Sequence, residues 1–186
     1  MQTRTHTTKI VMTALMMGLI MVAILFIRIP IPFTQGYVHP GDAMIFLAVL
    51  VLGWKYGAIA AAFGGMLGDI VGGVAAWAPW TFVIKGVMAI IVGLLIEIAL
   101  RKPDAGRKRI LAAEITGMVL AGAFMATGYY FAEGLMYGNW IVAALGIPWN
   151  IGQFVFGMLL AGILAEALCK TPVKGYFTYR LPAKNA

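Results

Sequence analysis

The sequence lacks the residues from which most enzyme sites and disulfide frameworks are built. Its 186 residues include no serine, one cysteine (Cys169) and two histidines (His6 and His39). A serine nucleophile, a disulfide framework and a cysteine metal site are therefore excluded. The chain also has neither an H-E-x-x-H motif nor a Gly-x-x-x-x-Gly-Lys phosphate loop. We predict no catalytic residue, no metal site and no cofactor, and we expect any ATP hydrolysis to occur on partner chains.

Charged residues are scarce as well. Only 11% of the residues are charged and 62% are hydrophobic, with a mean hydropathy of +0.91, whereas soluble domains are typically about 25% charged. The apolar residues form long runs, and a helix of about 20 apolar residues crosses the hydrocarbon of a bilayer. These features predict an all-α integral membrane protein, with residues 1–186 forming one bundle of six transmembrane helices.

The predicted spans are separated by breaks rich in proline, glycine or basic residues. The second span is short for a full crossing, and Pro148 is suited to the first position of the last helix. Residues 137–147, before that helix, are predicted to form a mixed loop. The spans cover about residues 10–29, 42–53, 56–74, 80–100, 110–136 and 148–168, with an outer loop at 30–41.

The distribution of Lys and Arg predicts the orientation in the membrane. If the N-terminus is cytoplasmic, twelve of the fourteen Lys and Arg residues lie on the cytoplasmic side, as the positive-inside rule requires. The exceptions are Arg28, at an outer helix end, and Lys85, within the fourth span. Both termini are therefore predicted to be cytoplasmic, and the net charge of +7 orients the protein in a bilayer rather than binding nucleic acid.

Small residues recur at every fourth position on three of the spans, and such faces allow helices to approach closely. Two of these faces are expected to pack inside the bundle, whereas the pair Ala14 and Gly18 on the first helix could equally contact another subunit. The two inner faces comprise Ala60, Gly64, Gly68, Gly72 and Ala76 on the third span and Gly157, Ala161 and Ala165 on the sixth.

Polar residues within the spans divide into two groups. On the cytoplasmic side, Glu97, Glu114 and Glu166 are expected to form interfacial ion pairs, with Arg101 and Lys170 four residues after two of them. On the outer side, several helices each contribute a polar group at one depth, because each lies within roughly 8 Å of the outer surface at 1.5 Å per residue. That layer consists of Asp42, Asp69, Lys85, Glu133, Asn150 and Gln153, with Trp77, Trp80, Tyr130 and Trp149 beside it.

The outer layer predicts a cavity that opens outward and binds a small, flat, polar heterocycle by stacking and hydrogen bonds. Each residue also has a simpler interpretation: the aromatics as an interfacial belt, Asp42 as a helix N-cap, and Lys85 with Glu133 as a structural pair. Two other classes of function stay open. One is an intramembrane enzyme that uses Asp69 or Glu133 as acid or base, and the other is a structural subunit that binds no ligand.

An ordered set of segments within residues 8–168 resembles the substrate-binding S-components of energy-coupling factor (ECF) vitamin transporters. The resemblance is greatest to the branch for riboflavin-like and for hydroxymethylpyrimidine- or pyridoxine-type substrates. The segments are Thr13-Ala-Leu-Met-Met-Gly18, Ile29-Pro-Ile-Pro32, Gly41-Asp-Ala-Met-Ile-Phe-Leu-Ala48, Tyr56-Gly-Ala-Ile-Ala60, Gly64-Gly-Met-Leu-Gly-Asp69, Trp77-Ala-Pro-Trp-Thr-Phe-Val-Ile-Lys-Gly86 and Pro148-Trp-Asn-Ile-Gly-Gln153.

The resemblance implies a non-enzymatic subunit of an ABC-type importer in a prokaryotic plasma membrane. Such a subunit captures a vitamin or precursor from outside, here hydroxymethylpyrimidine or pyridoxine with riboflavin as the alternative. It works with a transmembrane coupling subunit (the T-component) and two ABC ATPase subunits.

The resemblance also implies site residues. The family's Ala-x-x-x-Ala contact with the coupling subunit corresponds to Ala14 and Gly18, and its lid loop to residues 30–41, which include Tyr37 and His39. Asp69 is also predicted to bind the substrate, because it belongs to the outer polar layer. By position, the family's ligand contacts correspond to Trp80, Lys85, Tyr129, Glu133, Trp149, Asn150 and Gln153.

Overall fold

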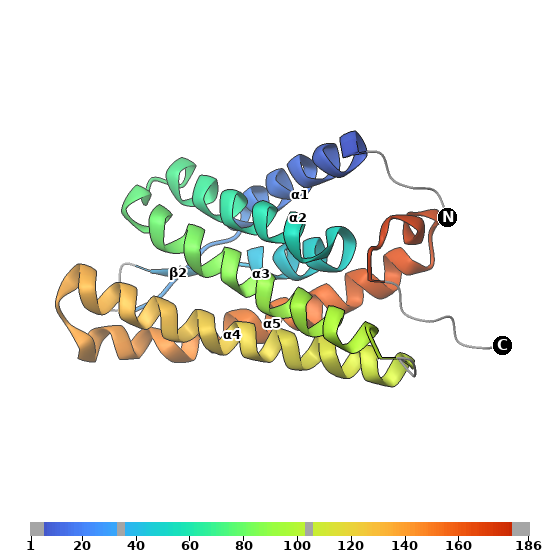
Figure 1. The fold of residues 1–186 in the computed structure, drawn as a ribbon. Helices are drawn as coiled ribbons and strands as arrows, with labels where there is room; N and C mark the ends of the chain where they lie inside the picture. Colours follow the sequence, from blue (N-terminus) through green and yellow to red (C-terminus); the bar gives the residue numbers. More distant parts are fainter. Residues whose placement is uncertain (1–5, 33–35, 103–105, 180–186) are drawn as a thin grey trace.

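A computed structural model describes residues 6–32, 36–102 and 106–179 of the chain. In these residues long helices run side by side, and one short hairpin interrupts them (Figure 1). The elements are α1 (His6–Phe26), β1 (Ile29–Pro30), β2 (Tyr37–Val38), α2 (Gly41–Val71), η1 (Ala75–Trp77), α3 (Ala78–Leu100), α4 (Arg107–Tyr137), α5 (Trp140–Cys169) and η2 (Pro172–Tyr176).

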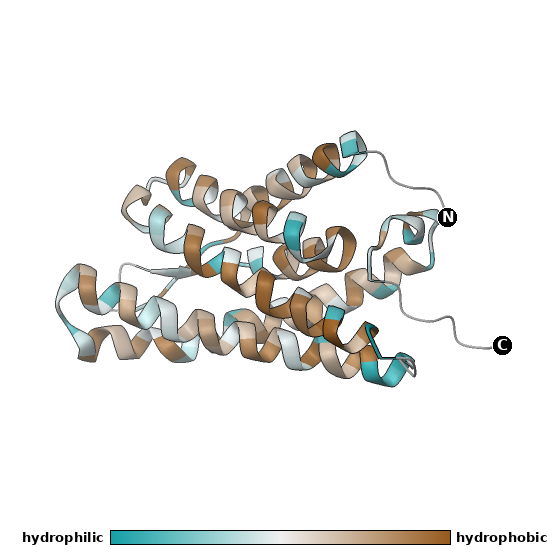
Figure 2. Cartoon of the chain, viewed as in Figure 1, coloured by the Kyte–Doolittle hydropathy of each residue, from teal (hydrophilic) through white to brown (hydrophobic). Residues whose placement is uncertain are grey.

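Five helices among the described residues are long and apolar enough to cross a membrane: α1, α2, residues 75–100, α4 and α5. Hydrophobic residues cover most of their length (Figure 2). The all-helical membrane class is thus confirmed, but the structure has five candidate spans instead of the predicted six. The predicted span 42–53 and most of the predicted span 56–74 belong to the single helix α2, which ends at Val71 and is broken at Gly53.

The break at Gly53 explains why the second predicted span looked short. Gly53 has φ 79° and ψ 171°, which are not helical values, and positive φ favours glycine. A Cβ atom at Gly57 would lie 2.9 Å from the Cα atom of Val49, so the two parts of α2 pack against each other just beyond the break. Residues 41–52 extend only about 18 Å at 1.5 Å per residue, less than the roughly 30 Å of hydrocarbon.

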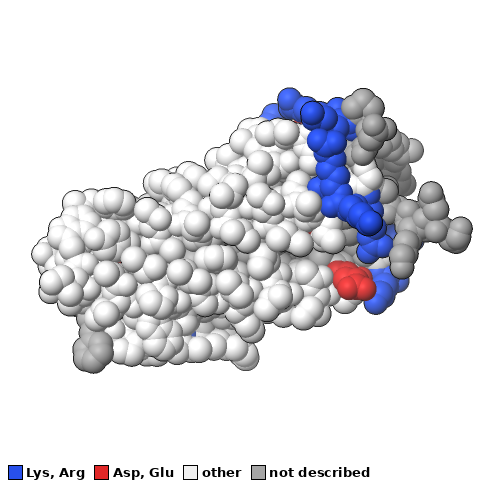
Figure 3. Space-filling view, turned by 90° about the horizontal axis from the view of Figure 1, so that it is seen from below, with Lys and Arg blue, Asp and Glu red and all other residues white. Residues whose placement is uncertain are grey.

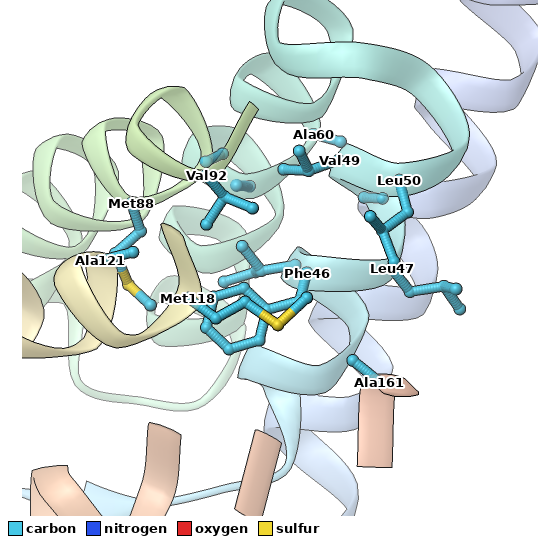
Figure 4. Packing of buried hydrophobic residues seen from close by; sticks show 14 of the residues in the cluster. Phe46, Leu47, Val49, Leu50, Ala60, Met88, Val92, Met118, Ala121 and Ala161 are labelled. Atoms are coloured by element: carbon cyan, nitrogen blue, oxygen red, sulfur yellow. The ribbon is translucent and has the colours of Figure 1, made fainter. Parts of the chain in front are cut away.

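The first part of α2 lies at the centre of the bundle. Every residue from Gly41 to Gly53 except Met44 is buried, as expected for a helix that is hydrophobic on all sides. Figure 4 shows this helix from close by, with Phe46 near Met118 of α4 and Val49 near Ala60 of the second part of α2.

The C-terminal segment caps the break in α2. The N–H groups of Thr178 and Tyr179 donate to the carbonyls of Val51 and Leu50 at 3.0 and 3.2 Å. The Tyr179 hydroxyl accepts from the N–H of Trp54 at 3.2 Å and donates to the carbonyl of Gly93 at 3.1 Å. Backbone groups freed by a helix break need partners where water is excluded, so this part of the C-terminal segment is integral to the fold.

Helix α5 begins earlier than predicted. Gly138 ends α4 in a left-handed conformation with φ 69°, and the side chain of Asn139 accepts from the N–H of Val142 at 3.0 Å as an N-cap. The helix therefore starts at Trp140, and the predictions of a loop at 137–147 and of Pro148 as a first helical residue are wrong. Pro148 lies inside α5, as proline can within membrane-spanning helices.

Close packing between helices uses the predicted small residues. A Cβ atom at Gly64 would lie 2.9 Å from the Met17 carbonyl oxygen of α1, and one at Gly68 would lie 3.0 Å from the Ile24 side chain. On α5, a Cβ atom at Gly157 would lie 2.8 Å from the Cβ of Asp42. These faces thus pack inside the bundle, as expected, although Ala76 at the end of the third-span series is exposed.

Lys and Arg side chains gather at the end of the bundle that also holds both termini (Figures 1 and 3). We call the opposite end the outer end. The predicted pair of Glu166 and Lys170 is present at 3.4 Å and exposed. Glu97 and Glu114 form no ion pair with any described residue, and Glu114 is buried in α4. The basic residues Arg4, Arg180 and Lys184 lie outside the described residues.

Substitution of Gly64 by alanine tests the packing of α1 on α2. The added methyl group would press on the Met17 backbone, and such overpacking typically costs about 1–3 kcal/mol. We expect Gly64→Ala to lower the melting temperature of the purified protein. Gly162→Ala is the matched control, because nothing lies within 4 Å of a Cβ at that position; equal melting temperatures for the two variants would contradict the close packing.

Candidate functional site

A cavity of about 40 Å³ lies at the outer end of the bundle, beneath the hairpin formed by β1 and β2. The hairpin pairs Ile29 with Val38 and Pro30 with Tyr37, and α2, α3, α4 and α5 form the rest of the wall. The cavity is lined by Ile31, Gly36, Tyr37, His39, Asp69, Trp77, Thr81, Tyr129, Glu133, Asn150 and Gln153. Residues 33–35 of the predicted lid lie outside the described residues.

Most of the predicted site residues meet at this cavity. Tyr37 and His39 come from the hairpin segment, whereas the other five come from α2, α4 and α5. The residues brought together from the helices are Asp69, Tyr129, Glu133, Asn150 and Gln153. Sequence analysis expected Asp69, Glu133, Asn150 and Gln153 at one depth, and Tyr129 was implied by the resemblance. Their role in binding a substrate stays a prediction.

Three predicted contacts do not line the cavity. Lys85 is completely buried below it and Trp80 packs against the hydrophobic core. Trp149 is 40% exposed on the bundle surface. Its neighbour Asn150 lines the cavity, because consecutive helical residues point about 100° apart.

Sequence analysis missed four lining residues as contacts. Ile31 and Gly36 belong to the hairpin, and Trp77 had been interpreted as part of an interfacial belt. Thr81 is buried and pairs with the Tyr129 hydroxyl at 3.1 Å. A usable signal was present, because Trp77, Thr81 and Lys85 are spaced by four residues and share one side of the chain at the start of α3.

A buried ion pair lies directly below the cavity. The Lys85 ammonium donates to Asp42 Oδ1 at 2.5 Å and to the Met125 sulfur at 2.9 Å, and both charged side chains are fully buried. Neither alternative interpretation holds: Asp42 makes no capping hydrogen bond, and Lys85 pairs with Asp42 instead of Glu133. Removing one partner of such a pair typically costs about 3–5 kcal/mol, because the other charge is left uncompensated.

Gln153 connects this ion pair to the hairpin segment. Its amide nitrogen donates to Asp42 Oδ2 at 2.9 Å, and its carbonyl oxygen accepts from the backbone N–H of His39 at 3.0 Å. One side chain of α5 thus holds both the start of α2 and the segment that covers the cavity. The position of the hairpin therefore depends on the buried pair beneath it.

His39 is neutral in this arrangement. Desolvation in its half-buried site and the nearby Lys85 ammonium lower the pKa of His39 to about 3. Its Nδ1 atom accepts from the backbone N–H of Gly41 at 3.1 Å, so the ring proton is on Nε2. A neutral imidazole next to the Lys85–Asp42 pair adds no charge to the buried site.

Tyr37 closes the hairpin onto α2. Its hydroxyl donates to Asp69 Oδ1 at 2.8 Å, and the Arg28 guanidinium lies 4.8 Å from the centre of its ring. Burial and the charge of Asp69 raise the pKa of Tyr37, so the hydroxyl keeps the proton that it donates. Arg28 also donates to the carbonyl of Gly72 at 2.8 Å, which fixes the cation at the C-terminal end of α2.

The cavity offers aromatic rings and hydrogen-bonding groups to a ligand. The rings of Trp77 and Tyr129 are 5.9 Å apart at 57°, and the second oxygen of Asp69 has no hydrogen-bond partner among the described residues. No group of His, Cys, Asp and Glu residues in the described chain is arranged to hold a metal ion.

The predicted partner surface lies on the outside of α1. Ala14 is exposed, Gly18 is half-buried, and nothing lies within 4 Å of a Cβ atom at Gly18. The pair therefore does not pack inside this bundle, which leaves it available to another subunit. Its contact with a coupling subunit stays a prediction.

Comparisons with known proteins agree with the arrangement. A family model described as "ECF-type riboflavin transporter, S component" matches residues 4–170. A Pyrococcus woesei protein, "Uncharacterized protein in gap 3'region", is 36% identical over 150 residues, covering 80% of this chain and 93% of its own length.

Two further proteins are similar to the chain. "Thiamine precursor transporter HmpT" of Lactococcus lactis subsp. cremoris is 28% identical over 149 residues, or 80% of each chain. A solved structure, "Structure and mechanism of the S component of a bacterial ECF transporter", superposes with a TM-score of 0.68 at 18% identity, covering 89% of this chain and 98% of the other. At that identity the superposition establishes the fold alone, whereas the family match covers most of the sequence. The chain therefore belongs to the S-component family of ECF transporters, which are non-enzymatic, substrate-binding membrane subunits.

Proposed function

We propose that this S-component captures a small water-soluble vitamin or precursor, hydroxymethylpyrimidine or pyridoxine, from outside the cell for ATP-driven uptake. The observation that carries the proposal is the covered cavity at the outer end, with aromatic walls and hydrogen-bonding groups from four helices and the hairpin. Such a combination is typical of sites that fix a flat polar ring in one orientation.

The size of the cavity supports a substrate with one ring. At about 40 Å³, it is well below the roughly 300–1,000 Å³ of pockets for drug-sized ligands, so the hairpin and wall must yield to admit any vitamin. A single substituted ring requires less expansion than the three fused rings of riboflavin. The likeness to a thiamine precursor transporter favours the same class of substrate.

Riboflavin is the second candidate, because the matching family model is described as a riboflavin transporter component. The outer hairpin is held to the bundle by a few side-chain hydrogen bonds, to Gln153 and Asp69. Displacing it would enlarge the cavity on one side without disturbing the helices. Ligand measurements on one preparation distinguish the two candidates.

The proposed orientation places both termini and the basic end in the cytoplasm, following the positive-inside rule and the concentration of Lys and Arg in Figure 3. The outer end then faces the source of substrate. In this orientation the exposed Ala14 and Gly18 surface of α1 would contact the transmembrane coupling subunit, whose two ABC ATPase partners supply the energy.

Direct ligand measurements test the proposed substrate. Purified protein should retain, or bind tightly, hydroxymethylpyrimidine or pyridoxine, with quenching of tryptophan fluorescence because Trp77 lines the cavity. Mass spectrometry of the bound ligand and titration with the three candidates provide the measurement. Binding of none of them would refute the proposed function, and tight binding of riboflavin alone would establish the second candidate.

Substitution on α1 tests the proposed partner surface. We expect Gly18→Leu to abolish co-purification with the coupling subunit and ATPases while leaving ligand affinity unchanged, because a bulky side chain prevents close helix contact. Gly162→Leu is the matched control, since Gly162 lies on α5 and also has nothing within 4 Å of a Cβ. A Gly18→Leu protein that still assembles would show that the coupling subunit docks elsewhere.

A further inference from the structure

The lining of the cavity is rich in hydrogen-bond acceptors and acidic. Asp69 and Glu133 each contribute a carboxyl group, and both are about 5% exposed. No Lys or Arg is among the described residues that line the cavity. A ligand in this cavity therefore meets an excess of acceptors over cationic donors.

One acceptor in the wall is left without a hydrogen bond. Asp69 Oδ1 accepts from the Tyr37 hydroxyl at 2.8 Å, whereas Oδ2 is buried and has no hydrogen-bond partner among the described residues. The Thr81 hydroxyl lies near this carboxyl group, but it pairs with the Tyr129 hydroxyl at 3.1 Å. A buried carboxylate oxygen without a donor is unfavourable. Because Asp69 lines the cavity, a ligand that donates a hydrogen there would satisfy it.

The nearby cations do not supply that donor. The Lys85 ammonium is bound to Asp42 and Met125 below the cavity. Arg28 lies over the Tyr37 ring and donates to the Gly72 and Ile24 carbonyls. Neither cation hydrogen-bonds Asp69, and neither lines the cavity.

We propose that Asp69 determines substrate specificity by accepting a hydrogen bond from a ring amine of the substrate. The inference rests on the proposed function, and it narrows the substrate class to heterocycles that carry an exocyclic amino group, such as an aminopyrimidine. A ring that presents a carbonyl oxygen at the same position would face a carboxylate oxygen, and two acceptors repel. Sites built around a buried hydrogen bond discriminate strongly against analogues that lack the donor.

The same carboxylate also holds the cover of the cavity. Asp69 Oδ1 binds Tyr37 of the hairpin, so a substrate that donates to Oδ2 does not compete with Tyr37 for the same oxygen. A substrate without that donor would have to compete for Oδ1 or leave Oδ2 unpaired. The Asp69 side chain can therefore accept from the substrate amine and from the Tyr37 hydroxyl at the same time.

The test compares two ligands and two substitutions. The ligands are hydroxymethylpyrimidine with its ring amine and the analogue in which a carbonyl oxygen replaces that amine. The substitutions are Asp69→Asn, which keeps the shape but replaces one acceptor by a donor, and Glu166→Gln as the matched control. Glu166 is 72% exposed at the cytoplasmic end, far from the cavity. Affinities are measured by calorimetry, and melting temperatures report folding.

We expect the wild type and Glu166→Gln to bind the aminopyrimidine at least about 10-fold more tightly than the carbonyl analogue. This ratio corresponds to the free energy of one charge-assisted hydrogen bond. In Asp69→Asn this preference should disappear. If Asp69→Asn does not fold, the wild-type ratio decides alone.

Two results would overturn the inference. Equal binding of both pyrimidines by the wild type, or an unchanged ratio in folded Asp69→Asn, would refute the role of Asp69 while the proposed function stands. Binding of riboflavin and of neither pyrimidine would refute both the inference and the proposed substrate.

Discussion

Lys85 and Asp42 form an ion pair at 2.5 Å in the interior of the bundle, with no exposure of either side chain. Removing two charges from water costs several kcal/mol per ion, so such a pair persists only when both groups are fully satisfied. Here Lys85 also donates to the Met125 sulfur, and the Gln153 amide donates to Asp42. The Gln153 carbonyl oxygen in turn accepts from the backbone N–H of His39. Four helices and the segment before α2 therefore meet at one polar point, and the cavity lies directly above it.

The irregular parts of the bundle are arranged around that point. Asp42 reaches Lys85 because the first part of α2 is a short central helix, which the break at Gly53 makes possible. The C-terminal segment supplies hydrogen bonds to the backbone groups that this break exposes. The outer hairpin is fixed through Tyr37 and His39. A rigid interior with a lightly held cover fits a subunit that must admit a small molecule from one side and retain it.

Much of this arrangement could be predicted from the sequence, because depth in a membrane follows from position along a helix. The rise of 1.5 Å per residue placed Asp69, Glu133 and Gln153 at one level, and four-residue spacing identified the packing face at Gly64. Which side of a helix faces the cavity depends on how the neighbouring helices pack, and the sequence does not show this packing. Lys85 and Trp149 were therefore predicted as ligand contacts, although Lys85 points to Asp42 and Trp149 to the surface. The start of α5 was missed although Gly138 and Asn139 signal it, because Pro148 was interpreted as the first helical residue. The spans predicted at 42–53 and 56–74 left a break close to Gly53. The pairing of Asp42 with Lys85 was not predicted, because no local pattern indicates which buried residues face each other.

The central claim is that the Lys85–Asp42 pair supports the cavity from below without touching the substrate. A double-mutant cycle with Lys85→Met and Asp42→Asn tests it, with melting temperature and ligand affinity measured for all four proteins. Each single substitution should destabilise the protein by about 3–5 kcal/mol. The double variant should recover most of that loss and bind substrate nearly as tightly as the wild type. Additive destabilisation, or a folded double variant that no longer binds, would contradict the claim.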